Sequence, residues 1–133
     1  MKAEKITYTN TVIVTEKDID DIVCTALEGG INYWCKQARV VGDYLGEYAS
    51  DQISRGGKLT LVLYEAADDT DKVEYTLRKG NLLNGIKLYM ENPHPYDITC
   101  VEHSVTKLDT CHVDGVVADM IVQYAIFGEI VFG

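Results

Sequence analysis

The sequence has little positive charge and few residues able to bind phosphate. Its 133 residues carry 12 Lys and Arg against 21 Asp and Glu, a net charge of −9, and only Arg39, Arg55 and Arg78 are arginines. Sequence-independent binding to a nucleic-acid backbone needs a basic face, which this composition does not supply. We therefore expect no direct nucleic-acid binding.

Long hydrophobic runs are also missing. The longest apolar tract, 115–132, is interrupted by Asp119, Gln123 and Glu129, and residues 1–10 contain no apolar stretch of the kind that a secretory signal needs. About 18 consecutive apolar residues are required to span a bilayer. The sequence thus predicts a cytoplasmic protein that does not enter a membrane.

Cysteine is sparse and is not arranged for a metal. The four cysteines are Cys24, Cys35, Cys100 and Cys111. In a reducing compartment we expect them to be free thiols, buried or half-buried. Cys100 and His103 have a plausible spacing for zinc, but Cys111 and His112 are adjacent and their side chains converge poorly on one ion. We expect no metal and no cofactor.

A single domain, 1–133, accounts for the length, and its patterns indicate an α+β fold. Thr15 and Asp18 resemble a capping box at the start of an N-terminal amphipathic helix. Its apolar stripe consists of Ile19, Ile22, Val23, Ala26 and Leu27. Asp114 is the expected N-cap of a C-terminal helix with a second apolar stripe. That stripe consists of Val117, Met120, Ile121, Tyr124 and Ala125.

Alternating residues predict a small antiparallel sheet that contains a 58–64/72–77 hairpin, packed with the two terminal helices. A further helix is expected at 78–92, with its apolar side chains facing inward. These side chains are Leu82, Leu83, Ile86, Tyr89 and Met90. Residues 37–47 fit either a helix or a strand-like path with glycine bends, and 129–132 predicts a short terminal strand.

Aromatic and arginine side chains gather between residues 28 and 57. The candidate ligand-binding residues are Tyr33, Trp34, Arg39, Tyr44, Tyr48, Asp51 and Arg55. Aromatic faces stack on flat bases, and arginine pairs with phosphate in a bidentate manner, so these residues fit a nucleotide pocket. The same residue types are typical hot spots of protein interfaces. A third interpretation places Trp34 and the tyrosines in the core beside the first helix.

The sequence contains no convincing catalytic motif. The Gly29-Gly30 and Gly56-Gly57 pairs match neither a Walker loop nor a dinucleotide fingerprint. Asp97, His103 and Ser104 supply the residue types of a hydrolytic triad without a nucleophile elbow. We therefore assign no catalytic residue and favour a non-enzymatic protein.

Four segments of the chain carry a resemblance to known proteins. They are Thr25 to Cys35 (TALEGGINYWC), Val41 to Gly46 (VGDYLG), Ala49 to Gly57 (ASDQISRGG) and the tail from Ala118 to Gly133 (ADMIVQYAIFGEIVFG). These segments resemble a family of small proteins from phages and prophages of Gram-positive bacteria. The resemblance covers most of the chain and implies a viral accessory protein that acts in the cytoplasm of a host bacterium. It assigns no functional residue.

Small phage accessory proteins commonly inhibit host defence by binding. The sequence therefore favours a counter-defence protein that sequesters a nucleotide-type immune signal in the 28–57 cluster. One alternative is an acidic inhibitor that occludes a host defence enzyme such as a CRISPR nuclease, for which the charge of −9 would speed association with a basic cleft. A second alternative is an accessory role in phage replication. We also expect a homo-oligomer, because the C-terminal helix is strongly apolar.

Overall fold

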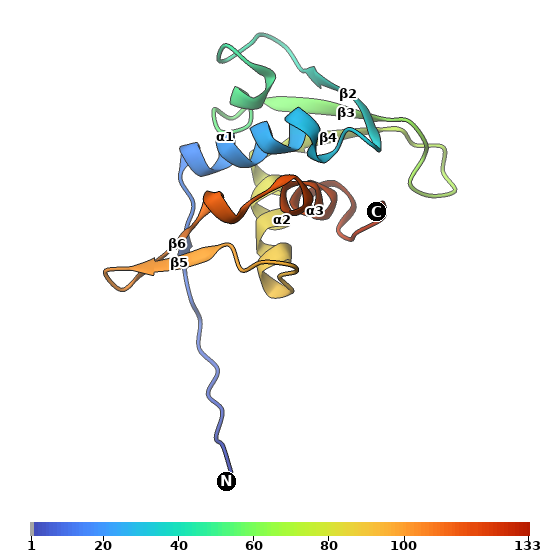
Figure 1. The fold of residues 1–133 in the computed structure, drawn as a ribbon. Helices are drawn as coiled ribbons and strands as arrows, with labels where there is room; N and C mark the ends of the chain where they lie inside the picture. The colour runs from blue at the N-terminus through green and yellow to red at the C-terminus, as the bar shows by residue number, and fades with distance from the viewer. Residues whose placement is uncertain (1) are drawn as a thin grey trace.

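Two small sheets and three α-helices form the structure, a computed structural model that describes residues 2–133 (Figure 1). The elements in chain order are β1 (Val12–Ile13), α1 (Glu16–Thr25), η1 (Ala26–Gly30), β2 (Cys35–Val40), η2 (Ala49–Asp51), β3 (Lys58–Leu63), β4 (Glu74–Arg78), α2 (Lys79–Glu91), β5 (Thr99–Glu102), β6 (Val105–Leu108), η3 (Thr110–His112) and α3 (Gly115–Phe127). One sheet has the order β2-β3-β4 and the other β1-β6-β5. This arrangement confirms the predicted α+β class.

Helix α1 begins where its sequence predicts. The hydroxyl of Thr15 accepts a hydrogen bond from the backbone N–H of Asp18 at 3.1 Å, and the Asp18 carboxylate accepts one from the Thr15 N–H at 2.9 Å. This reciprocal pair satisfies two backbone donors that the first turn leaves free. The predicted stripe then packs inward, with Ile19, Ile22 and Val23 buried.

The β3–β4 hairpin forms as predicted. Leu59, Leu61 and Leu63 are buried on one face of β3, while the residues between them lie on the other face. In the ambiguous 37–47 segment, the strand alternative is correct. Strand β2 pairs with β3 in antiparallel orientation as far as Val40, and Gly42 then turns the chain with a φ of +78°.

The β1-β6-β5 sheet was not predicted from the sequence. Strands β5 and β6 form a hairpin whose two tip residues, His103 and Ser104, both have positive φ angles of 51° and 65°. Two-residue turns of this kind usually contain Asn-Gly or Asp-Gly, so His-Ser gives little signal. Strand β1 then adds in parallel to β6, with Val12 opposite Thr106.

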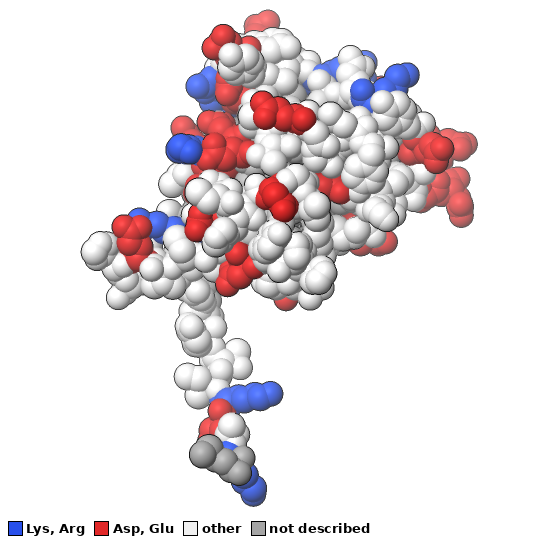
Figure 2. All heavy atoms as spheres, in the orientation of Figure 1, with Lys and Arg blue, Asp and Glu red and all other residues white. Residues whose placement is uncertain are grey.

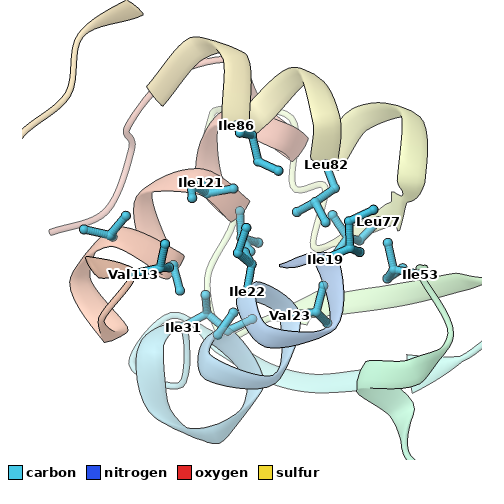
Figure 3. Packing of buried hydrophobic residues seen from close by; sticks show 14 of the residues in the cluster. Ile19, Ile22, Val23, Ile31, Ile53, Leu77, Leu82, Ile86, Val113 and Ile121 are labelled. Atoms are coloured by element: carbon cyan, nitrogen blue, oxygen red, sulfur yellow. The ribbon is translucent and has the colours of Figure 1, made fainter. Parts of the chain in front are cut away.

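The core lies between the β2-β3-β4 sheet and the helices, and side chains from α1, α2 and α3 meet in it (Figure 3). The backbones of α2 and α3 approach closely at Gly85, where an added Cβ would collide with the carbonyl oxygen of Ile121. Leu82, Ile86 and Tyr89 are buried as expected, but Leu83 is 39% exposed, because the buried face of α2 is narrower than the predicted stripe.

The predicted terminal strand at 129–132 is wrong. Helix α3 ends at Gly128 in the left-handed conformation, and the tail turns back along the helix. The backbone N–H groups of Val131 and Phe132 donate to Oε1 of Gln123, both at 2.8 Å, and Nε2 of Gln123 donates to the Phe132 carbonyl at 3.1 Å. One buried side chain thus pairs with the tail in place of a neighbouring strand.

The cysteines are free, but they are less buried than expected. Cys35 is buried and Cys24 half-buried, whereas Cys100 and Cys111 are exposed because they lie on β5 and in η3, away from the core. Every helix among residues 2–133 is too short or too polar to cross a membrane.

Candidate functional site

Residues 41–57, here called the aromatic loop, have large apolar side chains that are exposed to solvent. Tyr44 and Tyr48 are each 62% exposed, and Leu45 is 49% exposed. These side chains follow β2 and precede β3, so both ends of the loop are fixed in the sheet. The core interpretation is therefore wrong for Tyr44 and Tyr48, whose rings are available to a partner.

Buried residues at the base of the loop hold it in one shape. Gln52 is 1% exposed, and its Oε1 accepts a hydrogen bond from the Leu45 N–H at 2.6 Å, while its Nε2 donates to the Tyr48 carbonyl at 2.7 Å. Ile53, next in sequence, is fully buried in the core. Moving the loop away from this buried amide would break both hydrogen bonds, which costs free energy. The displayed side chains are therefore presented on a preorganised loop.

Asp51 and Arg55 also support the loop. The Asp51 carboxylate accepts a hydrogen bond from the Tyr48 N–H at 2.9 Å, and the Arg55 guanidinium donates to the Leu45 carbonyl at 3.0 Å. Gly46 passes so close to both side chains that a Cβ there would collide with them. The structure thus brings four of the predicted site residues together in one loop. Tyr44 and Tyr48 are exposed to solvent, and Asp51 and Arg55 form hydrogen bonds to the loop backbone.

Trp34 lies in a different place, in the core. It is 2% exposed, and its ring stacks on Phe132 with the ring centroids 5.6 Å apart and the planes 8° from parallel. Its Nε1 donates to Oδ1 of Asp119 at 2.7 Å. The core interpretation is therefore correct for Trp34, and its faces are not free to stack on a ligand.

Tyr33 is the exposed neighbour of this buried cluster. Its hydroxyl donates to Oδ2 of Asp119 at 2.6 Å, although 56% of the residue is exposed. Partial burial of the hydroxyl, followed by the hydrogen bond to the Asp119 carboxylate, raises the pKa of Tyr33 to about 12. Gln123 completes the group by donating to the same carboxylate at 2.9 Å.

Arg39 belongs to neither group. It lies on β2, and its Nη2 is 2.7 Å from Oε1 of Glu74 on β4, across the outer face of the sheet. Both side chains are about half exposed, so the ion pair contributes little to stability. The predicted cluster thus separates into the aromatic loop, the Trp34 group and an isolated sheet residue.

Two surface depressions border the predicted residues. The larger, of about 720 Å³, lies beside Tyr33 and is lined by Glu28, Asp119 and several glycines. The other, of about 420 Å³, lies beside Tyr48 and is also lined by Glu28. Neither depression has Lys or Arg in its lining. Carboxylates without a nearby cation oppose the binding of an anionic ligand.

The sequence did not predict that Asp119 and Gln123 form one buried hydrogen-bonded group with the C-terminal tail. The sequence does contain a sign of this group, because these two polar residues interrupt the apolar C-terminal tract and are four residues apart. Residues with this spacing share one face of a helix. The sequence pattern did not reveal which residue would donate a hydrogen bond to Asp119, because that donor, Trp34, is 85 residues away along the chain.

The hydrogen-bond partner that the structure gives Asp97 is Thr99, not one of the other two triad residue types. The Asp97 carboxylate accepts hydrogen bonds from the backbone and hydroxyl of Thr99, which lower its pKa, and His103 and Ser104 are exposed at the β5–β6 turn. The Asp97 carboxylate thus stabilises the backbone turn that leads into β5.

No protein-family model, curated protein or solved structure matches this chain.

Proposed function

We propose that this protein is a non-enzymatic binding protein that docks on a basic surface of another protein through the aromatic loop. The observation that supports this most directly is the exposure of Tyr44, Leu45 and Tyr48 on a loop whose backbone is held by buried Gln52. Tyrosine is enriched among residues that dominate binding energy, and a preformed loop loses little conformational entropy on binding.

Acidic residues around the tyrosines indicate the charge of the partner. Asp43 and Glu47 are exposed on either side of Tyr44, and Glu28 lies in the depression that Tyr48 borders. Figure 2 shows Asp and Glu side chains spread over the body, with Lys and Arg mainly at its upper right and left edges. An aromatic centre with an acidic rim complements a basic cleft and increases the rate of association.

The resemblance to phage proteins suggests the biological setting of this activity. A basic cleft that an acidic protein would block is a property of enzymes that bind nucleic acid, including nucleases of host defence. The proposed role is therefore counter-defence in the cytoplasm of a host bacterium, by occlusion of such an enzyme. A protein of phage replication with a basic surface is the alternative partner.

Sequestration of a nucleotide signal is the second candidate. The observation in its favour is the exposed ring of Tyr33 beside the larger of the two depressions. It ranks second because Arg39 is paired with Glu74, Trp34 is buried, and the depression is lined by carboxylates.

The test is capture from a lysate of a Gram-positive host, followed by binding to the purified captured protein. We expect Tyr44→Ala/Tyr48→Ala to raise the Kd for that protein about 100-fold, because two interface tyrosines are removed. Raising the salt concentration should slow association of the wild-type chain. Tyr96→Ala is the matched control, since Tyr96 is 49% exposed outside the loop and should bind normally.

Equal binding by the loop variant and by wild type would contradict docking through the aromatic loop. Native mass spectrometry of the same lysate sample separates the two candidates. An intact small adduct released on denaturation, without a retained protein, would favour the nucleotide instead.

A further inference from the structure

Residues 2–11 form an arm that makes little contact with the rest of the chain. The arm lies outside the helices and strands and is exposed throughout, with Ile6 86% and Tyr8 76% exposed. In Figure 1 it runs from β1 away from the body. A side-chain hydrogen bond from Asn10 to Thr106, 3.3 Å long, ties its base to β6.

The arm has the composition of a β-strand. From Ile6 onward, β-branched and aromatic residues predominate, and large apolar side chains alternate with threonines as far as Thr9. Ile6 and Tyr8 would lie on one face of an extended chain, and Thr7 and Thr9 on the other. One face is therefore apolar and the opposite face polar, the pattern of a strand that is covered on one side.

Strand β2 offers an unpaired edge for such a strand. It is the terminal strand of its sheet, and its inner neighbour is β3. The Val41 N–H donates to the Lys58 carbonyl, so by antiparallel alternation Arg39 also faces β3. The N–H and C=O groups of Ala38 and Val40 consequently point away from β3, toward the free edge.

A groove runs beside this edge. It has a volume of about 400 Å³, and its walls include residues of β2 together with Leu27, Ile31 and Ala49. Ala38 lines the groove from β2, on the same face as the buried Leu61 opposite it. A strand added to β2 would direct alternate side chains into this partly apolar groove, as in peptide recognition by strand addition.

The arm of a second copy is the occupant that this chain itself offers, because the arm has the pattern of a strand and lies outside both sheets. The groove is lined by one charged residue, Lys36, and by no Asp or Glu, so backbone pairing with β2 and the contacts of Ile6 and Tyr8 would hold the arm, not charge. Figure 1 places β2 and the arm on opposite sides of the molecule, so the arm is directed away from its own groove.

We propose that the arm of one copy adds as an edge strand to β2 of a second copy, with Ile6 and Tyr8 in the groove. A two-fold symmetric pair would form two such contacts. This assembly goes beyond the proposed function and is tested separately, because the arm and the aromatic loop are different segments.

The experiment measures the mass of the full-length protein by light scattering and its dimer Kd by sedimentation. We expect wild type to form a dimer and Ile6→Asp/Tyr8→Asp to raise the Kd about 100-fold, because two large apolar side chains no longer enter the groove. Thr7→Asp/Thr9→Asp adds the same charge on the polar face and should dimerise nearly as well as wild type.

Two variants test the receiving edge. Ala38→Pro removes an N–H that points away from β3, and Ala49→Glu places a carboxylate in the groove, so either should weaken the dimer as the arm variant does. Circular dichroism verifies that each is folded. Mixing Ile6→Asp/Tyr8→Asp with Ala49→Glu should restore a mixed dimer through the one intact arm and the one intact groove.

Three results would overturn the proposal. These are a wild-type chain that stays monomeric at its highest soluble concentration, an arm variant that dimerises like wild type, and edge variants that fold and still dimerise fully.

Discussion

Asp119 shows how one residue can join parts of the chain that are far apart in sequence. Its carboxylate accepts hydrogen bonds from Tyr33, Trp34 and Gln123, and these donors are all uncharged. A carboxylate that is 8% exposed is stable in such a place only when donors satisfy its oxygens. The group fixes the turn before β2 against α3, and through Gln123 it also fixes the tail.

The raised pKa of Tyr33 leads to a prediction about stability at high pH. The folded state holds the Tyr33 proton more tightly than the unfolded state, because the pKa rises from 10.0 to about 12. The resulting stabilisation is complete below pH 10 and is lost as the pH rises through about 12. Urea unfolding should therefore show a steeper loss of stability over this range for wild type than for Tyr33→Phe.

Other tyrosines and lysines titrate in both proteins, so the difference between the two curves isolates Tyr33. Parallel curves for wild type and Tyr33→Phe between pH 10 and pH 12 would contradict the assignment.

At the scale of elements, the crossing of α2 and α3 depends on a missing side chain. Gly85 lies in the middle of α2, where glycine normally weakens a helix. Its Cα faces the backbone of α3, so the two helices approach more closely than an alanine would allow. The loss of helix propensity is offset by the packing of residues on either side, such as Leu82 and Ile86.

We expect Gly85→Ala to lower the free energy of unfolding by about 1–3 kcal/mol, because the added methyl group collides with backbone that cannot rotate away. Gly80→Ala is the matched control in the same helix, where a Cβ would meet nothing within 4 Å. It should raise stability by about 0.5 kcal/mol through helix propensity. Chemical denaturation measures both. Equal effects of the two substitutions would show that the close approach is unimportant.

At the scale of the whole molecule, the dominant property is unbalanced negative charge. Residues 2–133 contain four ion pairs of Lys or Arg with Asp or Glu, all of them at least partly exposed, against a total of 21 Asp and Glu in the sequence. Such pairs contribute little, so repulsion among the remaining carboxylates opposes compaction. The same excess of charge would guide the protein to a basic partner.

Salt should therefore stabilise this protein. Raising the ionic strength from about 0.01 M to about 0.15 M shortens the Debye length from about 30 Å to about 8 Å. We expect the melting temperature to rise by about 2–5 °C as repulsion is screened. Asp69→Asn/Asp71→Asn, at the exposed β3–β4 tip, should reduce this rise. A melting temperature that falls with salt would show that the ion pairs dominate.

Local patterns were sufficient for the elements whose information is contained in neighbouring residues. The capping box at Thr15, the apolar stripe of α1, the N-cap Asp114 and the β3–β4 hairpin could all be read from the sequence, because hydrogen bonds and burial repeat at short, regular intervals. The β5–β6 turn could not be predicted in this way, because His103 and Ser104 adopt positive φ angles without the glycine or asparagine that usually marks such a turn.

For the candidate site, the sequence by itself determined which residue types were concentrated between 28 and 57, and hence that binding by aromatic side chains was a possibility. Only the tertiary structure decided their roles. It placed Trp34 in the core against Phe132, paired Arg39 with Glu74, and left Tyr44 and Tyr48 outward over Gln52. The physical reason is that burial depends on contacts with residues distant along the chain, and a local pattern cannot specify those contacts.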